Sequence, residues 1–243
     1  MPSGEEPWAI LYGLEKRVQL HAGRYPAVFY PLYRLARKNP AQAVTPETQL
    51  VIEGFPRSAN TFAVLAFRQA QRGKVHVAHN LHVPAQVIRA SRWQIPALVL
   101  IRDPKDAVLS FVVRDRISVD QALKHYVSFY ETVAEYRDDF VLGTFEEVTG
   151  DYGTVIRHIN DRFGTGYLPF RHNERSVGRV FARMERRYRK RHAEQSVEAR
   201  ISRPSPDREK MKREVSYELD DPRRGRLVSA AHAVYERLTG PEA

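Results

Sequence analysis

An arginine and several hydroxyl side chains follow a short apolar run in VIEGFPRSANT, residues 51–61. The run ends at Gly54, and the residues after the polar loop, NTFAVLAF, have the apolar spacing of a helix. A loop that leads from a parallel strand into a helix presents unpaired backbone N–H groups and the positive end of the helix dipole. Arg57, Ser58 and Thr61 add a cation and two hydroxyls. We therefore expect a phosphate-like anion to bind here.

The same segment departs from the phosphate loop of nucleoside triphosphatases. When the pattern GxxxxGK[ST] is aligned on Gly54, Ala59 and Asn60 stand where glycine and lysine are required, while Thr61 keeps the hydroxyl. Arg57 could supply the missing charge, because its planar guanidinium suits oxyanions. Most strand-to-helix loops bind nothing, so this segment alone is equally compatible with an ordinary polar turn.

A second junction of the same kind lies in IRDPKDAVLSF, residues 101–111. It places Arg102 at the end of an apolar strand and Ser110 two turns into a helix, as a candidate second anion pocket. Two alternatives remain open: Asp103 caps the helix while Arg102 pairs with a carboxylate, or Asp103 is the aspartate that holds magnesium in P-loop NTPases. Two anion-binding strand ends arise together by chance much less often than one.

Together, GFPRSANTF and LVLIRDPKDAVLSF resemble the sulfotransferase family that uses 3'-phosphoadenosine 5'-phosphosulfate. In that family the loop P-[KR]-[SA]-G-[TN]-T-[WFL] binds the 5'-phosphosulfate, and R-[DN]-P-[KR]-D-x-x-x-S binds the 3'-phosphate. The second motif matches at every defined position. The first departs at Ala59, and Asn60 is a variant that some bacterial members share, so the chain resembles a bacterial-type member.

The resemblance implies a P-loop-type α/β fold, 3'-phosphoadenosine 5'-phosphosulfate as co-substrate, and no metal requirement. Arg57 would stabilise the leaving phosphate, and Arg102 and Ser110 would hold the 3'-phosphate. Phe62 would stack on adenine or else face the core. The nucleotide-binding residues implied in this way are Arg57, Ser58, Ala59, Asn60, Thr61, Phe62, Arg102 and Ser110.

Sulfuryl transfer to a hydroxyl or amine also needs a base for the acceptor's proton, and the pKa of histidine suits that role. The segment KVHVAHNLHVP supplies His76, His79 and His82. By position His79 best matches the catalytic histidine of the family, although Val77 stands where the family has lysine. His82, or a carboxylate from elsewhere, is the alternative. A zinc site is a weaker interpretation, since no complementary ligand cluster accompanies the histidines.

The elements that must position these residues alternate between strand and helix, which predicts a parallel sheet with helices on both faces, a three-layer α/β fold. We expect one domain made of a helical segment 1–48, broken at Pro26 and Pro31, a nucleotide-binding core 49–165, and a basic helical part 166–243. Strands are expected at 49–55, 74–79, 97–102 and 140–148, and helices at 60–72, 84–91, 103–115, 118–136, 151–164 and 225–238.

The net charge of +10 is concentrated between Arg171 and Arg213, where the sequence has 15 Lys and Arg against 6 Asp and Glu. Residues 176–197 predict a helix with one apolar stripe and an arginine-rich face. That face is either simply solvated, or contacts an anionic glycan or lipid acceptor, an acidic membrane surface or, last in rank, nucleic acid. RPSPDREK, at 203–210, resembles the family's late basic loop, so Arg200 and Arg203 are further candidates for nucleotide contact.

Other features limit the compartment and the function. The chain has no cysteine, which excludes disulfides and thiolate chemistry. The apolar run IPALVLI is too short to span a bilayer, and the start MPSGEEPWAI has acids where a signal peptide needs basic residues, so we expect a cytoplasmic protein. The alternatives to a sulfotransferase are a P-loop kinase or NTPase with a degenerate loop, and a non-enzymatic basic module. The acceptor and the oligomeric state are not indicated.

Overall fold

The structure is a computed structural model, and it describes residues 22–36, 39–191 and 206–240. Its centre is a parallel sheet of four strands in the order β2-β1-β3-β4. The strands are β1 (Leu50–Gly54), β2 (Val77–His79), β3 (Ala97–Ile101) and β4 (Val141–Thr144). Each is short and strongly apolar, as expected of strands covered on both faces.

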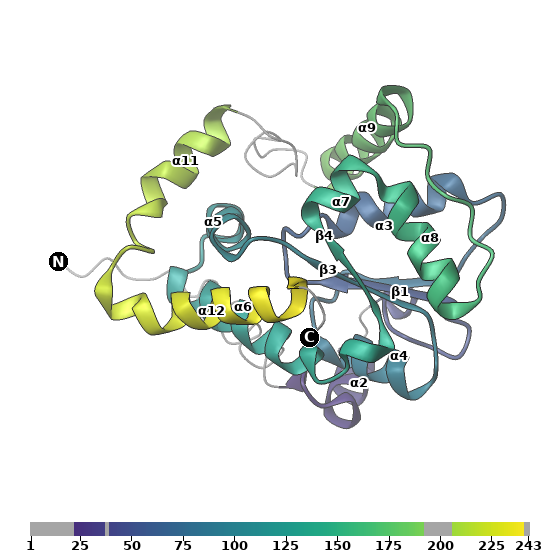
Figure 1. Cartoon of the computed structure of the whole chain (residues 1–243), viewed down its shortest axis with the longest axis horizontal. Coiled ribbons are helices and arrows are strands. Elements are labelled where there is room, and N and C mark those ends of the chain that lie inside the picture. The colour runs from purple at the N-terminus through teal and green to yellow at the C-terminus, as the bar shows by residue number, and fades with distance from the viewer. Residues whose placement is uncertain (1–21, 37–38, 192–205, 241–243) are drawn as a thin grey trace.

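Helices cover both faces of the sheet, which confirms the predicted three-layer α/β fold (Figure 1). One layer contains α3 (Asn60–Ala70), α8 (Tyr152–Phe163) and α9 (Glu174–Arg191). The opposite layer contains α2 (Pro26–Leu35), α4 (Pro84–Arg92), α6 (Val119–Ala134) and α12 (Gly225–Thr239). The remaining α-helices are α5 (Pro104–Asp115), α7 (Phe145–Gly150) and α11 (Pro206–Ser216), and short 3-10 helices span Pro40–Gln42, Arg137–Asp139 and Pro222–Arg224.

Alternation along the strands separates the two layers of the core. Leu50 and Ile52 of β1 pack with the layer of α3, α8 and α9. Val51, between them, packs with the layer of α2, α4, α6 and α12. Because successive strand side chains point to opposite faces, the last residue before Gly54, Glu53, belongs to the side of Val51 and α4.

Two predicted boundaries are wrong for identifiable reasons. The strand expected at 140–148 ends at Thr144, where a capping box with Glu147 starts α7: the Thr144 side chain accepts from the Glu147 N–H while the Glu147 side chain accepts from the Thr144 N–H. Pro31 was expected to break a helix, but α2 continues through it, and Pro31 is exposed on the side away from the core. Within the described ranges, no helix combines the length and apolar content needed to cross a bilayer.

Gly54 ends β1 at a point of very close backbone contact. It is in register with Leu100 of β3, and a Cβ placed on Gly54 would lie 2.3 Å from the Leu100 carbonyl oxygen. Only a residue without a side chain allows the two strands to stay paired up to the start of the loop. The glycine therefore keeps the ends of β1 and β3 together.

Gly54→Ala should destabilise the fold by about 3 kcal/mol, because the clash is with backbone and the strands must separate to relieve it. Urea unfolding measures the loss. Gly150→Ala is the matched control, since a Cβ on Gly150 meets nothing within 4 Å. Equal stability of the two variants would contradict the close contact.

Candidate functional site

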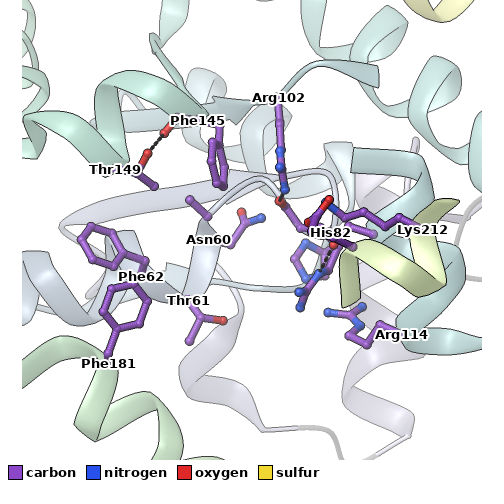
Figure 2. A pocket seen from close by; sticks show the side chains of 14 residues that line it. Asn60, Thr61, Phe62, His82, Arg102, Arg114, Phe145, Thr149, Phe181 and Lys212 are labelled. Carbon is purple, nitrogen blue, oxygen red and sulfur yellow. Dashed lines mark hydrogen bonds and ion pairs between the residues drawn. The ribbon is translucent and has the colours of Figure 1, made fainter. Parts of the chain in front are cut away.

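A cavity of about 260 Å³ lies at the carboxyl ends of β1 and β3, where the two candidate anion-binding segments, 51–61 and 101–111, leave the sheet (Figure 2). It receives side chains from the 55–59 loop, α3, α5, α7, α9 and α11 and from the loop after β2. The residues that line it are Arg57, Ala59, Asn60, Thr61, Phe62, His82, Arg102, Ser110, Arg114, Phe145, Thr149, Phe181, Glu209 and Lys212.

The 55–59 loop turns sharply through two left-handed residues. Arg57 has φ 73°, and Ala59, immediately before α3, has φ 65° and ψ 13°. Alanine in this conformation costs about 1–2 kcal/mol where glycine would cost little. The turn starts α3 at Asn60, so that the unpaired N–H groups of its first turn lie beside the cavity. The loop thus has the geometry that anion binding needs, even with alanine in place of glycine.

Two buried tyrosines of α6 form hydrogen bonds with backbone groups at the ends of β1 and β3. The Tyr130 hydroxyl donates to the Leu100 carbonyl at 2.7 Å and accepts from the Phe55 N–H at 3.3 Å. The Tyr126 hydroxyl donates to the Arg102 carbonyl at 2.7 Å. Burial raises the pKa of both phenols, so they remain protonated donors. α6 therefore holds the two junctions in fixed positions.

Ser58 lies beneath the loop, outside the set of residues that line the cavity. It is fully buried, and its hydroxyl is 3.4 Å from the hydroxyl of Tyr130. Asn60 is on the cavity side: its side-chain N–H₂ donates to the Phe55 carbonyl at 2.9 Å. The Asn60 side-chain oxygen is buried and has no hydrogen-bond partner among the described residues.

The two sequence motifs meet in the cavity through their side chains. The Arg57 Nε–H donates to the Ser110 hydroxyl at 2.9 Å, across 53 positions of sequence. The guanidinium of Arg102 donates to the Arg57 carbonyl at 3.5 Å and to Asp106 at 2.8 Å, and it stacks 3.9 Å above the ring of Phe145. Arg57, Arg102 and Ser110, proposed from separate segments, are thus linked by hydrogen bonds and line one cavity.

The lining is strongly cationic. Among the described residues that line the cavity, Arg57, Arg102, Arg114 and Lys212 oppose a single carboxylate, Glu209. Lys212 of α11 is largely buried and lies 2.9 Å from Glu209. Just outside the lining, Asp106 pairs with Arg102 at 2.8 Å and Asp115 pairs with Arg114 at 2.6 Å, so part of this positive charge is neutralised. The charge that remains favours an anionic ligand.

Lys212 and Arg114 were not identified from the sequence. Lys212 belongs to the basic stretch 171–213, but nothing local distinguishes it from its neighbours, and only the packing of α11 against α5 brings it to the cavity. Arg200 and Arg203, the sequence candidates for that region, lie outside the described residues.

The opposite end of the cavity is aromatic. Phe62 is 4% exposed, and its ring centroid is 5.8 Å from that of Phe181 at an interplanar angle of 46°. Phe170 packs edge-on to Phe62 at 6.2 Å. Phe62 therefore belongs to the core, as one alternative predicted, and it also lines the cavity, while its contact with adenine stays a prediction.

The structure separates the candidate histidines. His79 is still inside β2, paired with Ile52, and is not among the residues that line the cavity. Strand geometry places it about 7 Å short of the level of Gly54. His82, three residues later in the loop, does line the cavity, and its ring Nδ1 lies 2.7 Å from the Gly54 carbonyl oxygen.

This contact determines the state of the His82 ring. A carbonyl oxygen can only accept, so Nδ1 carries a hydrogen and donates it to Gly54. In the neutral ring the lone pair is then on Nε2. The His82 carbonyl is itself 3.2 Å from Nε2 of the buried His125, which holds the loop from the other side. In the neutral ring, Nε2 of His82 is therefore the nitrogen that can accept a proton.

A fully buried carboxylate, Glu53, lies behind His82. Its Oε1 is 3.7 Å from His82 Nδ1. Backbone N–H groups of Gly54, Leu81 and His82 and the side chain of Gln86 donate to it. Burial nevertheless raises the pKa of Glu53 to about 7, against these opposing hydrogen bonds. Sequence analysis did not single out Glu53, because an acid inside a strand has no recognisable motif.

Asp103 has a structural role. Its side chain caps α5 by accepting from the Asp106 N–H at 3.1 Å, as one of the alternatives predicted, and it is not among the residues that line the cavity. Within the described residues, no group of three or more His, Cys, Asp or Glu side chains is arranged to hold a metal ion.

Comparisons with known proteins give one kind of match. No protein-family model matches the chain, and no curated protein sequence matches it. Among solved structures, the chain is similar to a mouse sulfotransferase, SULT7A1, complexed with PAP, at 11% sequence identity and a TM-score of 0.45, over 82% of this chain and 88% of that chain. The function is therefore inferred from the residues of the site itself.

Glu53 should make stability depend on pH in an unusual direction. Its folded pKa of about 7 exceeds the ordinary 4.5, so between these pH values the folded state holds a proton that the unfolded state releases. Stability from this group is then greatest at low pH and falls as pH rises to about 7, by roughly 3 kcal/mol at most. Urea unfolding across this window should show a flatter dependence for Glu53→Gln than for the unchanged protein, and identical slopes would contradict the raised pKa.

Proposed function

We propose that this protein is a sulfotransferase that moves a sulfuryl group from 3'-phosphoadenosine 5'-phosphosulfate to an acceptor hydroxyl or amine. The observation that carries the proposal is the contact between Arg57 and Ser110, because it joins the two motifs into one cationic cavity at the carboxyl edge of the sheet. Open α/β sheets bind ligands at this edge. The proposed domain extends from the helical segment 1–48 through the core 49–165 to the basic part 166–243.

The residues present fit this nucleotide. Its several negative charges match a lining in which, among the described residues, four cations oppose one carboxylate. Its aromatic base matches the Phe62 and Phe181 end. Two buried polar atoms without a partner among the described residues, Asn60 Oδ1 and Arg102 Nε, are available to it. A bound nucleotide would therefore satisfy groups that the protein alone leaves unsatisfied.

Each part of the cavity then has a role. Arg57, Asn60, Thr61 and the first N–H groups of α3, which starts after Ala59, would hold the 5' end, while Arg102 and Ser110 would hold the 3'-phosphate. Ser58 supports the loop from beneath through Tyr130. Lys212 and Arg114 add charge beyond the two motifs. Phe62 and Phe181 would contact the adenine.

The co-substrate supplies the sulfuryl group when bound: the acceptor oxygen or nitrogen bonds to sulfur, the bond from sulfur to the 5'-phosphate oxygen breaks, and the acceptor loses a proton. We assign that proton to His82 Nε2 rather than to His79, because His82 lines the cavity and its Nδ1–H is held by Gly54. Arg57 stabilises the negative charge that develops on the leaving phosphate. Arg57 also donates to Ser110, so the two phosphate sites are coupled.

Glu53 acts as a positioning residue for His82. It receives the N–H groups of Leu81 and His82, so it fixes the loop that carries the base. Its carboxylate, 3.7 Å from His82 Nδ1, also favours the protonated imidazole that forms when the acceptor's proton arrives. His82 would thus accept the proton, and Glu53 would position its ring and stabilise its protonated form.

The acceptor is proposed only by class: a small molecule, glycan or lipid that carries a hydroxyl or amine. Contact of the basic stretch 171–213 with an anionic surface, the absence of nucleic-acid binding and a cytoplasmic location remain predictions. A kinase or NTPase is disfavoured because Asp103, its expected magnesium ligand, caps α5 outside the cavity lining. A non-enzymatic basic module would not need the Arg57–Ser110–Arg102 group at all.

Thermal stability and calorimetry with 3'-phosphoadenosine 5'-phosphate, ATP with magnesium, and ADP test the co-substrate. At a hundredfold excess over Kd, the 3'-phosphorylated nucleotide should stabilise the fold by about 2.7 kcal/mol, and the other two by much less. Arg102→Ala should abolish the difference, while Arg92→Ala, on α4 and outside the cavity lining, should keep it. If only ATP with magnesium stabilised the fold, the protein would be a kinase or NTPase. If none of the three nucleotides did, the non-enzymatic basic module would be the remaining alternative.

His82→Ala should lower kcat by about a hundredfold to ten-thousandfold, the contribution of a general base, with nucleotide affinity nearly unchanged. His79→Ala should leave kcat close to that of the unchanged protein. The rate of 3'-phosphoadenosine 5'-phosphate formation with a panel of hydroxyl and amine acceptors measures both variants. The reverse order of losses would assign the base to His79.

A further inference from the structure

The side of α2 that faces solvent is almost entirely apolar. Four of its large side chains are well exposed and fall on one face at helical spacing: Tyr25 (62%), Val28 (48%), Leu32 (44%) and Leu35 (80%). Ala27, Pro31 and Ala36 are exposed on the same side of the helix. Eight large apolar side chains are exposed among the described residues, so half of them lie on this one short helix. Scattered exposed apolar residues are normal, but a gathered set marks an interaction surface.

A further exposed apolar side chain, the indole of Trp93 (46%), lies at the end of α4, the helix that packs against α2. The guanidinium of Arg89 lies between the two helices, 3.0 Å from the ring centroid of Tyr30 and 5.0 Å from that of Trp93. We call this surface, made of Tyr25, Val28, Leu32, Leu35 and Trp93, the α2 face. Its aromatic members, Tyr25 and Trp93, each combine an apolar ring with one polar group, and such side chains suit a boundary between apolar and aqueous surroundings.

The two segments that form the α2 face carry charged side chains of positive sign only. Residues 22–46 and 84–96 contain no aspartate or glutamate, whereas Arg24, just before α2, and Arg34, on α2, are exposed, and Arg89 and Arg92 lie on α4. Two acids from other segments contact α4: Asp139 accepts from Ser91 at 2.7 Å, and the buried Glu53 accepts from Gln86 at 3.4 Å. An apolar face with arginines beside it, and no acid in its own segments, complements a surface that has an apolar interior beneath a negatively charged outer layer.

We propose that the α2 face docks this protein on an anionic lipid bilayer. Tyr25, Val28, Leu32, Leu35 and Trp93 would enter the boundary between headgroups and acyl chains, and the arginines would lie at the level of the lipid phosphates. The helix would lie in the plane of the surface and would not cross it. Anionic headgroups attract the arginines that lie near the surface.

This surface is separate from both the cavity and the basic helix. None of its residues lines the cavity, and α2 and α4 belong to the layer opposite α3 and α9 (Figure 1). The exposed arginines of α9, such as Arg179 and Arg183, therefore offer a different route to an anionic surface. The proposal does not depend on the sulfotransferase activity, so each can fail without the other.

Cosedimentation of the full chain with vesicles tests the proposal. We expect binding to vesicles of equal parts phosphatidylcholine and phosphatidylglycerol, and much weaker binding to phosphatidylcholine alone. Leu32→Glu combined with Leu35→Glu should lower the binding constant at least tenfold, because it removes apolar insertion and adds repulsion. Tyr217→Glu, which alters a comparably exposed aromatic outside the α2 face, should bind normally. Arg179→Glu combined with Arg183→Glu on α9 should lower binding much less than the α2 variant does.

The other occupants of the α2 face give different results. Loss of binding in the α9 variant but not in the α2 variant would overturn the proposal in favour of the basic helix. A concentration-dependent dimer in analytical ultracentrifugation, dispersed by the α2 variant, would assign the face to a second copy. A large fall in melting temperature of the α2 variant would show that the face is packed inside the chain, since substitutions at exposed sites change stability little. Absence of vesicle binding would also overturn it.

Discussion

The parallel pairing of β1 with β3 is the constraint on which the site depends. Parallel neighbours end at the same edge of the sheet, and the contact of Gly54 with the Leu100 backbone keeps them paired to their last residues. Everything that follows the strands is placed by this contact: Arg57 comes after one and Arg102 after the other, with Ser110 a turn or two into α5. Tyr126 and Tyr130 then bind the strand ends to α6, so the cavity is built on rigid elements.

The cavity lies where the two layers meet at the edge of the sheet. The first turn of α3 and Phe62 belong to the side of α3 and α9, whereas α5, which carries Ser110, packs with the opposite side. Glu53 is turned by strand alternation to the side of α4, where it is fully buried and holds the loop of His82. Gln86 connects this carboxylate further, to the Tyr30 hydroxyl of α2 and the Val44 N–H. A buried acid is costly unless it is well bonded, so such a network indicates a position whose geometry matters.

Several parts of the site could be predicted because their signals are local. Strand, loop and helix signals predicted the sheet, and the two strand ends predicted separate anion pockets at Arg57 and at Arg102 and Ser110, which the resemblance to sulfotransferases assigned to one nucleotide. Other assignments needed the fold. Ser58 and Thr61 look alike in sequence, but the left-handed turn at Ala59 sends one beneath the loop and the other to the cavity. Lys212 came from a stretch in which many basic residues are equivalent until α11 packs against α5.

The sequence by itself determined the fold class and predicted a cationic site at two strand ends, because hydrophobic periodicity and clustered cations are local features of the chain. Tertiary structure decided which histidine reaches the cavity, since β2 ends at His79 and the reach of a side chain is set by where its strand stops. It also decided the partner of that histidine. Glu53 and His82 are 29 positions apart, and only the pairing of β1 with β2 and the turn that follows bring them within 3.7 Å.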